Sequence, residues 1–406
     1  MSLTLKKQTN IALSFFLIAA LVGLFLRFLF IANVAVNFKY LLHTHSHVAL
    51  MGWVYLAMLV LINKCFFKPN KNQKHYRYIF TFTCICVIGM LLSFPFQGYA
   101  AISITFSTLF LFASYWFYWF FIKYTPLEKK QLQAYRILKY ALIYMLISSI
   151  GPWAVGGVMA TLGPQSVWYR IAIYFYLHFQ YNAWIILGLI GLFIYILENR
   201  HVVIKQKELR YFLLLFNAGL ILTVFLSILF TEPHSIFYGL SIIGGALQLI
   251  SLYYLGKAIP DLKTSPRSIF SPLEFTVLQW SLVLLVVKFM MQFFAGFAGV
   301  ATLINAYKNL TIGFLHWTFL GVISLSLFVL LSHFKLIRLT KKSVYFYAVG
   351  FVLTEALIFW RPFTFIFDID LAIPQFTLLF IASLLLVCAI LILMLMQFKK
   401  ARQKDV

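Results

Sequence analysis

The sequence contains few charged residues and very few acids. Asp, Glu, Lys and Arg make up 11% of its 406 residues, and only 10 residues are Asp or Glu. A soluble globular chain usually carries about 25% charged residues. Because 63% of the chain is hydrophobic, the composition excludes soluble enzyme folds, secreted disulfide scaffolds and nucleic-acid-binding modules. It predicts a protein that is embedded in a lipid bilayer.

Cysteine is also scarce. The chain has four cysteines, of which Cys84 and Cys86 stand two residues apart and therefore on different faces of one apolar helix. The others, Cys65 and Cys388, lie near the ends of apolar segments. Membrane cysteines in such places behave as small hydrophobic residues. We assign the four no chemical role.

Long polar connections are absent, whereas long apolar segments are abundant. A helix of about 20 residues crosses the roughly 30 Å hydrocarbon core of a membrane. Twelve segments meet this requirement, at residues 11–33, 43–67, 77–95, 99–123, 137–161, 170–197, 210–230, 235–256, 273–295, 311–331, 343–361 and 371–397. The longest connection, residues 257–272, is too short for an inserted domain. We expect an all-α polytopic bundle that forms one integral membrane domain over residues 1–406.

The distribution of basic residues predicts the orientation of this bundle. With the N-terminus inside, the inner segments carry 27 of the 33 Lys and Arg residues and the outer segments carry four. Cytoplasmic loops of membrane proteins carry such an excess, so the net charge of +23 needs no nucleic-acid partner. The first span is too long for the apolar region of a signal peptide. The expected location is the inner (cytoplasmic) membrane, with both termini in the cytoplasm.

Histidines recur on the second, sixth and tenth spans. His43, His45 and His47 lie on the second span, His178 on the sixth and His316 on the tenth. In the predicted topology all three helices run from outside to inside, and each carries its histidine within the first few turns. At a rise of 1.5 Å per residue, the imidazoles should therefore lie at nearly one depth in the outer part of the membrane.

The residues after three of these histidines form similar patterns. His47-VALM-Gly52-Trp53, His178-FQYN-Ala183-Trp184 and His316-WTFL-Gly321-Val322 share a histidine, four residues, a small residue and then Trp or Val. Helices 2, 6 and 10 are four apart, which indicates a threefold internal repeat. The expected quasi-repeats of four helices each, in a pseudo-threefold arrangement, cover residues 1–136, 137–272 and 273–406.

An ionisable side chain inside a membrane is costly and usually functional. Neutral imidazole ligates haem iron, copper and zinc, although a lone intramembrane histidine can also simply hydrogen-bond a hydroxyl or carbonyl on a neighbouring helix. His43 and His47 are four residues apart and share one helix face, while His45 points away. We predict His47 as the first ligand and His43 as a second metal ligand or a polar contact at the helix end.

Twelve spans, an inner N-terminus, three four-helix repeats and outer histidines on helices 2, 6 and 10 together resemble the haem-copper oxidase subunit I superfamily, including its nitric-oxide-related members. The resemblance covers most of the chain in topology, and in sequence only the stretches around the three histidines. It implies that His47 and His316 ligate one haem from opposite faces, that His178 belongs to copper, and that Arg361 holds haem propionates.

The chain also departs from that family. The seventh span lacks the histidines that complete the copper site, and helix 10 has a lone His316 where the oxidases carry His-x-His. Tyr181 comes three residues after His178, where many oxidases place a tyrosine at four. We therefore predict one haem and an incomplete copper site, and leave the catalytic residues unassigned. The expected role is electron transfer or redox chemistry of nitric oxide or oxygen, with a redox protein or quinol as partner.

Three further polar residues lie within the spans. Lys288 and Gln292 are four residues apart in the ninth span, and Glu355 lies in the eleventh. Because a buried charge requires a partner, we predict a Lys288–Glu355 ion pair that serves either as a proton path or as a packing element. The alternative function is a twelve-helix secondary transporter whose polar site surrounds Lys288 and Glu355.

Overall fold

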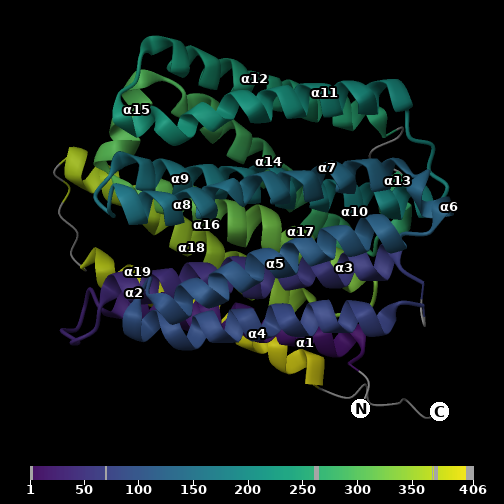
Figure 1. The fold of residues 1–406 in the computed structure, drawn as a ribbon, viewed down its shortest axis with the longest axis horizontal. Coiled ribbons are helices and arrows are strands. Elements are labelled where there is room, and N and C mark those ends of the chain that lie inside the picture. The colour runs from purple at the N-terminus through teal and green to yellow at the C-terminus, as the bar shows by residue number, and fades with distance from the viewer. Residues whose placement is uncertain (1–2, 69–70, 260–264, 368, 370–373, 399–406) are drawn as a thin grey trace. The chain divides into compact units, whose positions relative to one another are not determined.

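The computed structural model describes residues 3–68, 71–259, 265–367, 369 and 374–398. All regular elements in these ranges are helical (Figure 1). Twelve helices are long and apolar enough to cross a membrane, which confirms the twelve predicted spans. The start of the last predicted span, 371–373, and the C-terminal residues 399–406 lie outside the described residues.

Contacts divide the chain into two compact units. Unit 1 contains residues 1–120 and 327–406, and unit 2 contains residues 121–326. The elements of unit 1 are α1 (Leu5–Phe28), α2 (Phe38–His47), η1 (Val48–Tyr55), α3 (Leu56–Phe66), α4 (Gln73–Gln97), α5 (Ala101–Tyr124, which runs into unit 2), α17 (Leu325–His333), α18 (Lys341–Ile366) and α19 (Gln375–Phe398). These boundaries do not coincide with the ends of the predicted quasi-repeats, and the pseudo-threefold arrangement stays a prediction.

Unit 2 holds the middle of the chain. Its elements are α6 (Leu127–Lys130), α7 (Gln133–Ser148), α8 (Ile150–Thr161), α9 (Val167–Leu177), η2 (His178–Ile185), α10 (Ile186–Asn199), α11 (Gln206–Thr223), η3 (Val224–Thr231), α12 (Ser235–Ala258), α13 (Ser265–Ile269), α14 (Pro272–Ala295), α15 (Ala298–Ala306), α16 (Lys308–His316) and η4 (Trp317–Ser324). The fifth span is interrupted at Ser149, between α7 and α8. Pro152 comes soon after, and its ring conflicts with a regular helical path through the carbonyl four residues before it.

The three histidine-bearing spans share a local structure. In each of them an α-helix passes into eight residues of π-helix, η1, η2 and η4, and then returns to α-helix. The π-helical stretch begins at His178 and directly after His47 and His316. π-helical turns are rare and are frequent at functional sites. The recurrence supports an internal repeat of local structure at spans 2, 6 and 10.

These three spans are also the most buried of the twelve. Their central windows are 89%, 89% and 61% buried, whereas those of the other nine spans are 28–50% buried. In unit 1, Gly52 of η1 allows this close packing, because a Cβ there would lie 2.8 Å from the Cβ of Phe15 on α1. Trp53 stacks on Phe16, with ring centroids 4.8 Å apart. The histidines therefore stand on interior helices.

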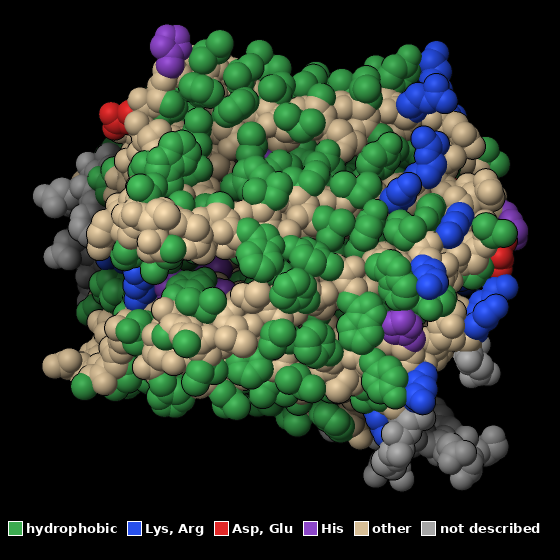
Figure 2. Space-filling model, in the orientation of Figure 1, with side chains coloured by type: hydrophobic (Ala, Val, Ile, Leu, Met, Phe, Trp, Pro, Cys, Tyr) green, Lys and Arg blue, Asp and Glu red, His purple; other side chains and the backbone are tan. Residues whose placement is uncertain are grey.

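The lipid-facing surface is apolar. Figure 2 shows hydrophobic side chains covering the sides of the helices, with Lys and Arg side chains toward the helix ends. Exposed large residues such as Leu92, Phe96 and Ile250 are costly in water and favourable in lipid. The surface agrees with a multi-pass protein in a lipid bilayer.

Glycines bring α11 and α12 of unit 2 into close contact. A Cβ at Gly244 would lie 2.8 Å from the backbone nitrogen of Thr223 and 2.9 Å from the carbonyl oxygen of Gly219. Small residues permit such backbone approach between membrane helices.

We expect Gly244→Ala to lower the free energy of unfolding by about 1–3 kcal/mol, the usual cost of overpacking. The matched control on the same helix is Gly239→Ala, where a Cβ meets nothing within 4 Å. Thermal unfolding in detergent measures both, and equal melting temperatures would contradict the expectation.

Candidate functional site

The first cluster lies in unit 1, where α2 presents two histidines. Asn37 caps α2 by accepting from the backbone nitrogens of Lys39 and Tyr40, which fixes the start of the helix. One ring nitrogen of His47, Nδ1, lies 2.8 Å from the carbonyl oxygen of His43. A carbonyl only accepts, so Nδ1 carries the proton and Nε2 carries the lone pair.

Tyr99 closes this cluster from the turn between α4 and α5. Its hydroxyl lies 3.2 Å from Nε2 of His47 and therefore donates to that lone pair. Gly98 positions Tyr99 because its φ of +59° belongs to the left-handed region. A Cβ at Gly98 would lie 2.4 Å from the Tyr40 ring. The phenol is thus placed by a backbone conformation that favours glycine.

The cluster also contains a buried ring nitrogen with no bonding partner. Among the described residues, Nε2 of His43 is buried and accepts or donates no hydrogen bond. The His43 ring packs edge-on against Tyr99, with centroids 4.6 Å apart, and the His47 ring lies 4.4 Å from that of Phe94. Burying an unsatisfied polar atom is costly, so this nitrogen is a candidate for an additional ligand contact.

Unit 1 also contains two arginines on the membrane-spanning helices, Arg27 on α1 and Arg361 on α18. Arg27 of α1 is close enough to interact by charge with Glu355 and Arg361 of α18, and also with His45 of α2. The ring of His45 bonds the carbonyl of Ala19 at 2.8 Å, which is the structural role that a lone histidine commonly plays. Arg27 and Arg361 thus bring two guanidinium groups near each other, and the guanidinium is the side-chain group that pairs best with a carboxylate.

The second cluster lies in unit 2 around His178. Its Nε2 lies 3.0 Å from the carbonyl oxygen of Leu220 on α11, and its Nδ1 lies 3.2 Å from Nδ2 of Asn182. Nε2 therefore donates and Nδ1 accepts. Both ring nitrogens are engaged, so a metal at Nδ1 of His178 would have to displace the Asn182 amide. The predicted copper role of His178 stays a prediction.

Lys288 of α14 completes this second cluster. It is fully buried, donates to Oδ1 of Asn182 at 2.7 Å and also donates to Gln292. Its ammonium lies 4.6 Å from the ring centroid of Phe289 and 5.5 Å from that of Phe314. Amide oxygens and aromatic faces, rather than a carboxylate, balance the charge.

The predicted Lys288–Glu355 ion pair would join the two units, and it stays a prediction. The partners described above for Lys288 all lie in unit 2. Glu355 lies in unit 1 beside Arg27.

His316 ends α16, immediately before η4 of unit 2, and is half-buried. His47 belongs to unit 1. The prediction that His316 and His47 share one haem therefore rests on sequence. Within the described ranges, no group of three or more His, Cys, Asp or Glu side chains is arranged to hold a metal ion.

Sequence reasoning missed two residues of these clusters. Tyr99 stands in the short turn between α4 and α5, and its only sequence signal is the preceding glycine. Asn182 lies four residues after His178 and hence on the same face, a spacing that could have indicated the pair. Comparison with known protein families and with curated proteins finds no match for this chain.

Proposed function

We propose that the protein is an integral membrane haem protein in which His47 would hold the haem iron. The observation that carries the proposal is the hydrogen bond from Nδ1 of His47 to the carbonyl of His43. Histidines that ligate metals commonly donate their other ring nitrogen to a backbone carbonyl, which orients the ring and makes the ligating nitrogen more basic. The bond leaves the lone pair on Nε2, which accepts from the Tyr99 hydroxyl here and is the atom that would hold the iron.

The surrounding residues suit this role. The aromatic rings of Phe94 and Tyr99 line the histidine cluster, and an apolar, water-poor setting raises the energetic value of each polar contact made there. Arg27 and Arg361 supply the positive charge that a propionate needs. When bound, the haem would supply one-electron redox chemistry or a binding position for a diatomic gas. His316, which the resemblance implies as the second haem ligand, belongs to unit 2, and its role stays a prediction.

An optical experiment tests the proposal. We expect purified wild-type protein, expressed with full haem supply, to show a Soret band and a reduced-minus-oxidised difference spectrum, with close to one haem per chain after extraction. Colourless protein that remains folded and monodisperse would overturn the proposal. This result would favour the second candidate function, transport, for which the fully buried Lys288 in unit 2 is the supporting observation.

We further propose that both termini face the cytoplasm, in an inner membrane. In a variant without native cysteines, Gln165→Cys and Lys205→Cys place one thiol at either end of the helical span that contains η2, and both positions are exposed. We expect a membrane-impermeant maleimide to label Gln165→Cys in intact cells. Lys205→Cys should be labelled only after permeabilisation. The reverse pattern would contradict the orientation derived from the basic residues.

A further inference from the structure

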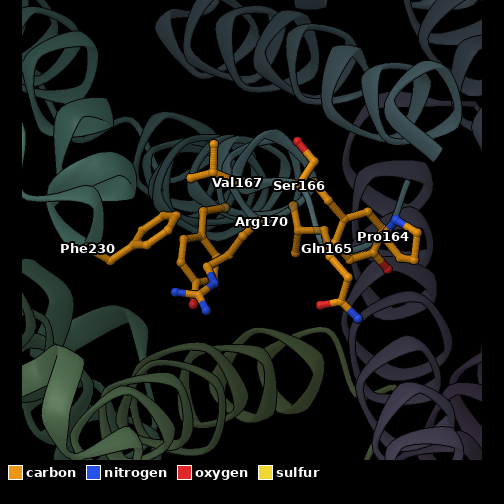
Figure 3. Close-up of a pocket in the computed structure, with 9 residues that line it drawn as sticks. Pro164, Gln165, Ser166, Val167, Arg170 and Phe230 are labelled. Carbon is orange, nitrogen blue, oxygen red and sulfur yellow. The ribbon is translucent and has the colours of Figure 1, made fainter. Parts of the chain in front are cut away.

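A pocket of about 390 Å³ opens at the start of α9 in unit 2. It lies at the end of the helical span opposite to the basic segment Arg200–Arg210. Figure 3 shows Arg170 and Gln165 directing their polar groups to the same side of the pocket, with Phe230 of η3 beside Arg170. The volume is within the usual range for small-molecule sites.

The charged side chain that lines this pocket is basic. Arg170 stacks on Phe230, with the guanidinium carbon 4.4 Å from the ring centroid, so its position is constrained. Lys308 of α16 is near enough to repel Arg170 by charge. None of the nine lining residues, all in the described part of the chain, is acidic. Arg170 is thus the charged residue of the lining, and Lys308 adds positive charge from outside the lining, an arrangement that favours an anion.

The remaining walls are amphipathic. Gln165 and Tyr169 add polar groups, whereas Tyr174 and Phe230 extend an apolar wall toward the membrane-crossing part of α9. The hydroxyl of Ser166 is already engaged, because it accepts from the backbone nitrogen of Trp168 to cap α9. An anion with an attached apolar chain would satisfy both kinds of wall.

We propose that this pocket binds the phosphate group of an anionic amphiphile, a phospholipid of the leaflet at this end of the bundle. Arg170 supplies charge-assisted hydrogen bonds to phosphate oxygens, which a planar guanidinium can make in pairs. Lys308 adds a second positive charge, and the Gln165 amide adds a neutral donor. The proposal is independent of the haem proposal, because every residue in it lies in unit 2 and none of the residues of the histidine clusters lines the pocket.

The test uses full-length protein in nanodiscs of phosphatidylcholine that contain increasing amounts of phosphatidylglycerol. Native mass spectrometry then counts the retained lipid molecules. We expect wild-type protein to retain one phosphatidylglycerol in preference to phosphatidylcholine. Arg170→Gln should lower this selectivity about tenfold, as the loss of a charged hydrogen bond predicts, and Lys308→Gln should lower it less. Arg170→Lys keeps the charge and should retain an intermediate selectivity.

The matched control is Lys39→Gln, which removes another predicted outer cation that does not line the pocket. It should leave the selectivity unchanged. Competition by millimolar inorganic phosphate in wild type, lost in Arg170→Gln, would support the same phosphate site with free phosphate as its source. Equal retention of the two lipids by wild type, or equal effects of Arg170→Gln and Lys39→Gln, would overturn the proposal. Unchanged melting temperatures verify that the variants are folded.

Discussion

Replacing His47 with alanine is expected to remove the Soret band while the protein stays folded. The side chain would take with it the ligating nitrogen that its bond to the His43 carbonyl orients. Loss of a residue that merely supports a ligand already lowers metal affinity 10- to 100-fold, so we expect haem content to fall by about tenfold or more. Haem extraction and an optical spectrum of purified protein measure the change.

The matched control is His45→Gln. His45 lies on the same helix, two residues earlier, and its ring bonds a carbonyl of α1, a contact that a glutamine amide can replace. This variant should keep its haem. Added imidazole should restore part of the band in His47→Ala by filling the vacated position. A full Soret band in His47→Ala, or an equal loss in His45→Gln, would show that His47 is not the ligand.

The second large effect is expected at Asn182. Its Oδ1 accepts from Lys288 and its Nδ2 donates to His178, so Asn182→Leu removes both contacts at once and leaves a buried ammonium with Gln292 as its remaining hydrogen-bond acceptor. Removing one partner of a buried charge costs about 3–5 kcal/mol. We expect a loss of this size in the free energy of unfolding, measured by denaturation in detergent micelles.

A double-mutant cycle isolates the interaction between the two side chains. Lys288→Met removes the charge at similar volume and leaves only neutral oxygens without a donor, at about 1–3 kcal/mol. The double variant Asn182→Leu/Lys288→Met should be less destabilised than the sum of the single variants, by about 0.5–3 kcal/mol. Additive effects would show that the buried lysine does not depend on Asn182.

The spans could be predicted because apolar length alone identifies a membrane helix, and the described helices agree with all twelve. The π-helical stretches could not. In segments such as Val48–Tyr55, nearly every side chain is apolar and buried. The spacing of polar residues, from which the number of residues per turn is normally inferred, is therefore missing. The repeated positions of His47, His178 and His316 were visible in the sequence, but the change of helix type beside them was not.

Partners of buried polar groups were predicted less well. Lys288 and Gln292 could be paired because four residues along a helix bring them together, and the structure confirms that contact. The partners Asn182 and Tyr99 come from other helices and turns, whose rotation depends on packing that a single sequence does not encode. The bond from Nε2 of His178 to the Leu220 carbonyl could not be predicted either, because a backbone acceptor has no side-chain signature in the sequence.

The π-helical stretches are places where the interior helices can change both their length and the rotation of one segment relative to the next. A π turn spans one residue more between donor and acceptor than an α turn. If one such turn tightened to α geometry, the segment before it would advance by about 1.5 Å and rotate by about 100°. His47 and His316 each directly precede such a stretch. Their imidazoles could thus be re-aimed by a local register change while the helix after the stretch remains anchored.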